Sequence, residues 1–231
     1  MPPINGSVSS TSGRRGLRAD ALRNRQQVLA AARDVFVELG AEAPLDEVAR
    51  RAGVGIATLY RRFPDRAALQ RAVALDVLAQ AGDAARRAEV EEADAVVALG
   101  RYMHAALDLQ ISAVMPVLLG RISFDDQEMS LARQRAVEPV LRMIASGQAA
   151  GQLRPDIAFG DIGTLLVRLS RPLPGALPRE LDLSLAHRHV DLFLDALRSA
   201  RGAELGGPRL SLSDLQAISA GASAGPPAVD P

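Results

Sequence analysis

The apolar positions of this chain recur every three or four residues, which is the spacing of one face of an α-helix. The first such stripe predicts a helix over residues 22–39, ended by Gly40. The same pattern predicts further helices over about 66–87, 94–110, 112–120, 129–150, 158–170 and 182–200. Asp65 is predicted to cap the start of the helix over 66–87, and Gly151 the end of the helix over 129–150. No segment alternates apolar and polar residues over a convincing length. The pattern therefore predicts an all-α fold. The first stripe consists of Leu22, Leu29, Ala32, Phe36 and Leu39.

The segment LDEVARRAGVGIATLYRRFPDR, residues 45–66, has the pattern of two short helices joined by a glycine turn. Ala49 is small enough to let two helices cross closely, and Gly53 can adopt the left-handed backbone of a tight turn. Leu59 then points back into the core. This spacing predicts a helix-turn-helix, which the helix over 22–39 completes as a three-helix DNA-binding domain. An ordinary helical hairpin, which also places Ala and Gly at its crossing, is the alternative.

The second helix of this motif carries the side chains suited to DNA. Thr58, Tyr60, Arg61 and Arg62 can donate hydrogen bonds to phosphates or base edges. The short residues at 55–57 allow the helix to approach a groove closely. These features predict that the second helix is the recognition helix.

Charge is distributed unevenly along the chain. Residues 1–71 contain 12 arginines and 7 acidic residues, and the remaining residues contain 15 and 20, so the net charge of zero hides a basic N-terminal third. Neutralisation of phosphates supplies most non-specific affinity for DNA. The asymmetry favours a DNA-facing domain at the N-terminus joined to a second domain with a different function.

Composition excludes several classes of site. The chain of 231 residues has no cysteine and three histidines, so it has neither disulfides nor thiolate metal sites, and we expect no cofactor. No apolar run approaches the roughly 20 residues that span a bilayer, and the N-terminus lacks the apolar core of a signal peptide. We therefore expect no membrane partner and a cytoplasmic location.

An all-α enzyme is an alternative class of function. The chain has no Gly-rich phosphate loop after a strand, no GxSxG and no HExxH. His187, His189 and Asp191 lie at i, i+2 and i+4 and do not share one helical face. The sequence therefore predicts that the protein is not an enzyme.

Both ends of the chain are rich in Ser, Gly and Pro, a composition typical of disorder. The N-terminal arm contains Arg14, Arg15 and Arg18, which can enter a minor groove. The predicted domains are a disordered arm at 1–19, a helix-turn-helix DNA-binding domain at 20–64, a helical effector-binding and dimerisation domain at 65–201, and a flexible tail at 202–231.

The last two predicted helices carry stripes that are more apolar than a terminal pair needs to cover its own domain. A two-fold four-helix bundle would bury them, which predicts a homodimer whose two recognition helices read a palindrome. The alternative is that both stripes pack inside one subunit. The predicted interface residues are Ile162, Leu165, Leu169, Ala186, Val190, Phe193 and Leu197.

Apolar and methionine residues between the recognition helix and this interface could line an adaptable cavity for a small effector. Tyr102 and His104 would be its polar anchors. Because apolar stripes at helical spacing are usually core, ordinary packing is the alternative for each residue. The candidate effector residues are Leu78, Leu99, Tyr102, Met103, His104, Leu107, Met115, Leu119, Phe124, Met143 and Leu166.

The run VLAAARDVFVELGAEAPLDEVARRAGVGIATLYRRFPDRAAL resembles the N-terminal DNA-binding domain of TetR-like bacterial transcriptional regulators, over roughly residues 24–70. The combination of AGVG, TLYRRF and FPDR carries this resemblance. Downstream, AAGQLRPD followed by two helices is similar to the end of the ligand-binding domain in the SbtR-like branch of the family.

The resemblance implies an all-α homodimer that binds a double-stranded DNA operator, usually represses, and is released by an unknown small-molecule effector. Effector binding would favour a state in which the recognition helices no longer fit successive major grooves. A dimeric small-molecule-binding or adaptor protein without DNA binding is the alternative function.

Carried over by position, the family's DNA contacts fall on the second helix of the motif and the start of the next. Pro44 departs from the family, because a Ser or Thr often caps the second helix there. Phosphate contacts fall on Thr58, Tyr60 and Arg66, and major-groove contacts fall on Gly55, Ile56, Ala57 and Arg61.

Overall fold

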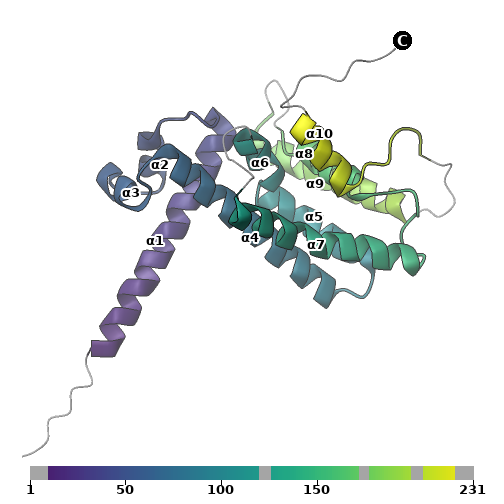
Figure 1. Cartoon of the computed structure of the whole chain (residues 1–231), viewed down its shortest axis with the longest axis horizontal. Coiled ribbons are helices and arrows are strands. Elements are labelled where there is room, and N and C mark those ends of the chain that lie inside the picture. Colours follow the sequence, from purple (N-terminus) through teal and green to yellow (C-terminus); the bar gives the residue numbers. More distant parts are fainter. Residues whose placement is uncertain (1–9, 120–125, 172–176, 199–204, 222–231) are drawn as a thin grey trace, which may run out of the picture. The chain divides into compact units, whose positions relative to one another are not determined.

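The computed structural model describes residues 10–119, 126–171, 177–198 and 205–221, and within them it contains helices and no strand. This confirms the predicted all-α fold (Figure 1). The helices are α1 Ser10–Leu39, α2 Leu45–Arg51, α3 Ile56–Arg62, α4 Arg66–Glu91, α5 Ala95–Asp108, α6 Ile111–Leu119, α7 Gln127–Ala149, α8 Phe159–Leu169, α9 Arg179–Leu197 and α10 Leu212–Gly221.

The chain divides into two compact units, and the division falls inside α4 between Asp76 and Val77. We call the described residues 10–76, together with 117–119, the N-terminal unit. The described residues 77–116 and those from 126 onward form the C-terminal unit.

The N-terminal unit has a small core built around the second half of α1. Leu29, Ala32 and Phe36 of the predicted stripe are buried there, and Leu59 of α3 is buried too. Leu39 is exposed, contrary to its predicted place on the stripe. It is the last residue of α1, and the chain turns away at Gly40, so no later turn of helix covers it.

Helix α1 begins at Ser10, which corrects the prediction of a disordered arm over residues 1–19. Arg14, Arg15 and Arg18 lie within this helix. Its N-terminal turns extend beyond α2 and α3 (Figure 1). Alanine, leucine and arginine favour helix, so an existing helix extends readily through RRGLRADAL. Residues 1–9 lie outside the described residues.

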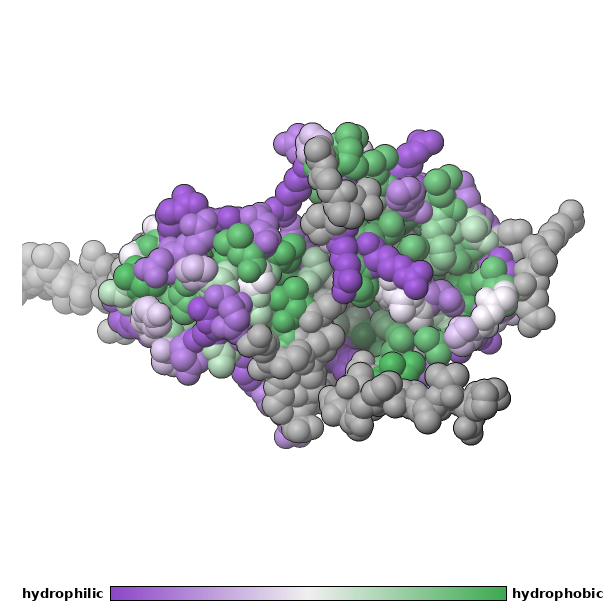
Figure 2. Space-filling model, turned by 90° about the horizontal axis from the view of Figure 1, so that it is seen from above, coloured by the Kyte–Doolittle hydropathy of each residue, from purple (hydrophilic) through white to green (hydrophobic). Residues whose placement is uncertain are grey.

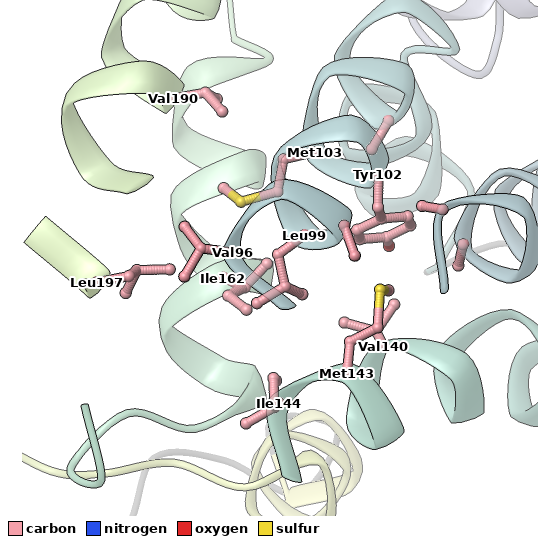
Figure 3. Close-up of a cluster of buried hydrophobic side chains, with 14 of the residues drawn as sticks. Val96, Leu99, Tyr102, Met103, Val140, Met143, Ile144, Ile162, Val190 and Leu197 are labelled. Atoms are coloured by element: carbon pink, nitrogen blue, oxygen red, sulfur yellow. The ribbon is translucent and has the colours of Figure 1, made fainter. Parts of the chain in front are cut away.

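The C-terminal unit is built around α5, which contacts α7, α8 and α9. Nearly every residue of α5 that faces these helices is buried, and Figure 3 shows apolar side chains gathered around Leu99. Asp94 caps α5 by accepting hydrogen bonds from the amides of Val96 (2.8 Å) and Val97 (3.0 Å). The predicted C-cap of α7 is confirmed, because Gly151 has a φ of +69°.

The segment from Leu205 to Gly221 includes helix α10, which corrects the predicted flexible tail in this part. Ser211 and Asp214 form a reciprocal cap, in which the Ser211 amide donates to the Asp214 carboxylate at 2.7 Å. The amide of Gly160, at the start of α8, donates to the carbonyl of Leu210 at 2.9 Å. The sequence did not predict these local contacts, because the Gly and Pro residues on both sides of the cap are typical of disorder.

On the face shown in Figure 2, hydrophobic and hydrophilic residues are mixed. Large hydrophobic side chains that remain exposed include Tyr60 on α3, and Leu181 and Leu192 on α9. Among the described residues, none of the helices is both long and apolar enough to cross a membrane.

Candidate nucleic-acid interface

The turn between α2 and α3 has the geometry that its sequence predicts. Gly53 has a φ of +66°, in the left-handed region. The amide of Val54 donates to the carbonyl of Ala49 at 3.0 Å, and the amide of Gly53 donates to that of Arg50 at 3.2 Å. This pair of hydrogen bonds is a Schellman motif, which satisfies the last carbonyls of α2. The turn therefore holds α3 in the place of a recognition helix.

One face of α3 is buried and the opposite face is open. Leu59 is completely buried, whereas Ala57, Tyr60 and Arg61 are exposed. Residues spaced three and four apart lie on the same face of a helix, so Ala57, Tyr60 and Arg61 form one surface. Gly55 precedes this surface and is also exposed. We call these four residues the α3 surface.

The remaining candidates on α3 are less accessible. Ile56 and Thr58 are half-buried, and they flank the α3 surface. Thr58 lies in the first turn, where its amide donates to the carbonyl of Gly55 at 2.8 Å. The structure therefore brings the predicted residues from 55 to 61 together on and beside one accessible helix face.

The arginines of α2 and α3 differ in their partners. Arg50 and Arg51 both donate to Glu47, at 2.7 to 2.8 Å, and Arg51 also reaches Glu38 at 2.6 Å. Hydrogen bonds from Arg50, and then from Arg51, lower the pKa of Glu47 to about 2. Arg61 makes no hydrogen bond or ion pair with any described residue. Of these three arginines, Arg61 is therefore the one free to contact a ligand.

Arg66 has a role that sequence reasoning missed. Its guanidinium donates to the carbonyl oxygens of Ala43 (2.5 Å) and Ala41 (3.1 Å). Gln70, one turn later and buried, also donates to Ala41 at 2.8 Å. Both side chains hold the connection between α1 and α2 against α4. These hydrogen bonds give Arg66 a positioning role inside its own unit, and its contact with phosphate stays a prediction.

The residues that precede α2 and α4 cap these helices as their side chains allow. Pro44 precedes α2 without a side-chain hydrogen bond to the helix. Asp65 accepts a hydrogen bond from the amide of Ala68 at 2.7 Å, as predicted for the cap of α4. The FPDR motif therefore ends one element at Phe63 and starts the next at Arg66.

Most predicted effector residues are packed core. Tyr102 is among them, and its burial raises the pKa of its hydroxyl to about 12. Met115 and His104 are half-buried, the side chain of Leu119 is not described, and Phe124 lies outside the described residues. The buried members are Leu78, Leu99, Tyr102, Met103, Leu107, Met143 and Leu166.

Three hollows are lined entirely by described residues of the C-terminal unit. A groove of about 410 Å³ runs between α7 and α10, a second of about 330 Å³ lies beside residues 205–209, and a third measures about 140 Å³. Only Met143, in the wall of the smallest, belongs to the predicted effector set. An effector cavity among the core residues therefore stays a proposal.

The predicted dimer stripes pack inside their own subunit. Ile162, Ala186, Val190 and Leu197 are buried in the cluster around α5, and the other three residues pack partly against it. The apolar side of α9 is needed to cover α5, which the sequence pattern of α9 alone could not reveal. The other three residues are Leu165, Leu169 and Phe193.

The fold and the α3 surface define a helical protein with an N-terminal helix-turn-helix, the class of DNA-binding regulators. The family described as "Bacterial regulatory proteins, tetR family" matches residues 28–73. A TetR transcriptional regulator from Streptomyces coelicolor is 30% identical, with a TM-score of 0.55, over 75% of this chain and 98% of that one. A TetR regulatory protein from Mycobacterium vanbaalenii is 31% identical, with a TM-score of 0.56, over 79% and 99%. The chain belongs to the TetR family of transcriptional regulators.

A third solved structure shares the fold. The TetR-like regulator LfrR from Mycobacterium smegmatis, in complex with proflavine, is 23% identical with a TM-score of 0.54, over 73% of this chain and 95% of that one. No curated protein matches the chain.

Proposed function

We propose that this protein is a homodimeric repressor that binds a palindromic operator and is released by a small-molecule effector. The α3 surface is the observation that carries the proposal. It places the hydroxyl of Tyr60 and the unengaged guanidinium of Arg61 beside the small residues Gly55 and Ala57. These groups suit phosphate and base edges, and membership of the TetR family supports the same role.

The proposed division of labour on α3 follows from exposure. Arg61, with Gly55, Ile56 and Ala57, faces the major groove and selects bases. Thr58 and Tyr60 donate to phosphates and set the position of the helix. We place Arg14, Arg15 and Arg18, from the first turns of α1, in the DNA minor groove.

Assembly into a dimer is proposed because one seven-residue recognition helix offers few base contacts. Two copies related by a two-fold axis read inverted half-sites together. The exposed apolar residues Leu181 and Leu192 on α9 support an interface on the outer side of this helix. Substituting Leu192 with arginine should shift the mass measured by light scattering toward the monomer, whereas Leu131→Arg, at an exposed position of α7, should not.

Effector control is proposed for residues 65–201, which include most of the C-terminal unit, and DNA binding for residues 20–64. The AAGQLRPD segment, followed by two helices, favours the SbtR-like branch. The cytoplasm is the proposed compartment. The methionines of the α5 core suit a cavity that opens around a ligand. The proflavine complex of LfrR supports a small-molecule effector. A coupling of about 1 to 3 kcal/mol would change operator affinity some 5- to 150-fold.

Fluorescence anisotropy with DNA from the chain's own upstream region tests DNA binding. Tyr60→Ala should weaken binding to all sequences, whereas Arg61→Ala should alter the preference among operator variants. Arg188→Ala is the matched control, because Arg188 is exposed on α9 and makes no ion pair with a described residue. If the wild type shows no salt-dependent binding to this upstream DNA, the adaptor function is favoured instead.

A further inference from the structure

Four side chains form a continuous chain across α5 and α9 in the C-terminal unit. The Nδ1 atoms of His104 and His187 are 2.7 Å apart. The Nε2 atom of His104 lies 3.0 Å from Oδ1 of Asp191, and that of His187 lies 3.1 Å from Oδ1 of Asp108. Each helix contributes a histidine and an aspartate four residues later. Each histidine therefore meets the aspartate of the opposite helix.

The two imidazole rings are oriented for a hydrogen bond in their common plane. Their planes differ by 21°, and their centroids are 5.0 Å apart. Because the Nδ1 atoms of His104 and His187 are only 2.7 Å apart, these atoms lie close to the line that joins the centroids. The rings thus meet at their edges through these nitrogens, and one Nδ1–H can point directly at the other ring's lone pair.

The hydrogen-bond partners determine how many protons this arrangement holds. A carboxylate only accepts hydrogen bonds, so each Nε2 must carry a proton toward its aspartate. This uses the single N–H of each neutral ring and leaves two lone pairs facing each other at Nδ1. One additional proton converts that contact into a hydrogen bond. A second additional proton would instead place two N–H groups against each other.

We propose that His104 and His187 hold one shared proton and so form a proton-dependent clasp between α5 and α9. The clasp carries one positive charge on two rings, between the carboxylates of Asp108 and Asp191. It is closed only while one proton is shared. Loss of this proton, or gain of another, opens the Nδ1 contact.

The residues around the clasp leave the protonation of the two rings as the main factor that opens or closes the Nδ1 contact. Helices α7 and α8 also pack against α5, but their described residues give no hydrogen bond or ion pair to either imidazole. Arg101, one turn before His104, is paired with Glu91 and Glu92. On α9, Arg188 and His189 are exposed beside His187.

Solvent can reach the clasp, because the side chains of His104 and His187 are 33% and 27% exposed. Its four polar groups lie in a row and do not converge on a point. Within the described residues, no cluster of three or more such ligands could hold a metal ion. The geometry therefore favours a proton over a metal between the two rings.

The test compares thermal unfolding of the full chain from pH 5 to 9 in the wild type and in His104→Gln, His187→Gln and the double variant. The wild type should show a maximum in Tm. At that pH each single variant should lose about 2 to 4 °C, the double variant should lose little more than a single one, and both single variants should show a flatter profile. His189→Gln, on the same helix but outside the clasp, should keep the maximum. A maximum that persists in both single variants, or additive losses, would overturn the proposal.

Nitrogen NMR of the wild-type histidine rings tests the proposal without any variant. At the pH of maximum Tm, one ring of the pair should be doubly protonated and the other should carry its proton at Nε2. Two neutral rings at that pH would overturn the proposal. A large Tm increase with Zn²⁺ that both single variants abolish would also overturn it, because a metal would then bridge the rings.

Discussion

Arg66 at the start of α4 donates a hydrogen bond of 2.5 Å to the carbonyl oxygen of Ala43, just before α2 begins. The contact joins residues 23 positions apart, and Gln70 adds a second tie to the same connection. The position of the helix-turn-helix within its unit therefore depends on α4 as well as on its own turn. Arg66 is accordingly a positioning residue.

Replacement of Arg66 by alanine should destabilise the N-terminal unit and weaken DNA binding without removing a phosphate contact. Hydrogen bonds from a charged group contribute about 1.5 to 3 kcal/mol, so the free energy of unfolding should fall by roughly that amount. The salt dependence of DNA affinity should keep its slope. A slope lower by about 1 for Arg66→Ala would instead assign it to a phosphate.

Gly53→Ala should destabilise the turn between α2 and α3, because a Cβ disfavours its φ of +66°. The expected loss is about 1 to 2 kcal/mol in the free energy of unfolding, measured by urea denaturation. Gly55→Ala is the matched control, since Gly55 has a φ of −68° and open space where a Cβ would stand. Equal losses in both variants would show that the left-handed turn is not the cause.

Gly160→Ala should detach the segment that contains α10 from α8. A Cβ on Gly160 would stand 2.5 Å from the carbonyl oxygen of Leu210, too close for any side chain. Overpacking of this kind costs about 1 to 3 kcal/mol. Hydrogen exchange should accelerate across residues 205–221. In the control Gly163→Ala, the nearest atom would be an ordinary contact at 3.4 Å, and exchange should be unchanged.

The ion pairs of Glu47 should make stability depend on acid pH. Its pKa is about 2 in the folded protein, below the ordinary value of 4.5, so the unfolded chain binds this proton more readily. The stabilisation is present above about pH 4.5 and is lost as the pH falls toward 2. The Tm difference between wild type and Glu47→Gln should shrink over that range. Asp46→Asn, which removes a neighbouring charge of α2, should show no such change.

Sequence reasoning succeeded where a feature depends on neighbouring residues. The turn at Gly53, the cap at Asp65 and the end of α7 at Gly151 were all predicted, because each needs only a local hydrogen bond or a left-handed glycine. The cap of Ser211 and Asp214 was equally local. It was missed because the Gly- and Pro-rich residues around it are typical of a flexible tail.

The candidate site was predictable for the same reason, but only in part. An alternation of buried Leu59 with exposed Tyr60 and Arg61 follows from helical spacing, and the structure bears out that exposure. The positioning role of Arg66 was missed because its partners are carbonyl groups, which have no signature in the side-chain sequence.

By itself, the sequence determined the helices, the helix-turn-helix and the family, because periodicity, caps and turn glycines act over a few residues. Only the tertiary structure decided which helix faces pair. It turned the apolar side of α9 inward onto α5, and it brought His104 to His187 across 83 positions. An apolar stripe indicates that one face of a helix must be buried, but the packing of all the helices together determines which surface buries it.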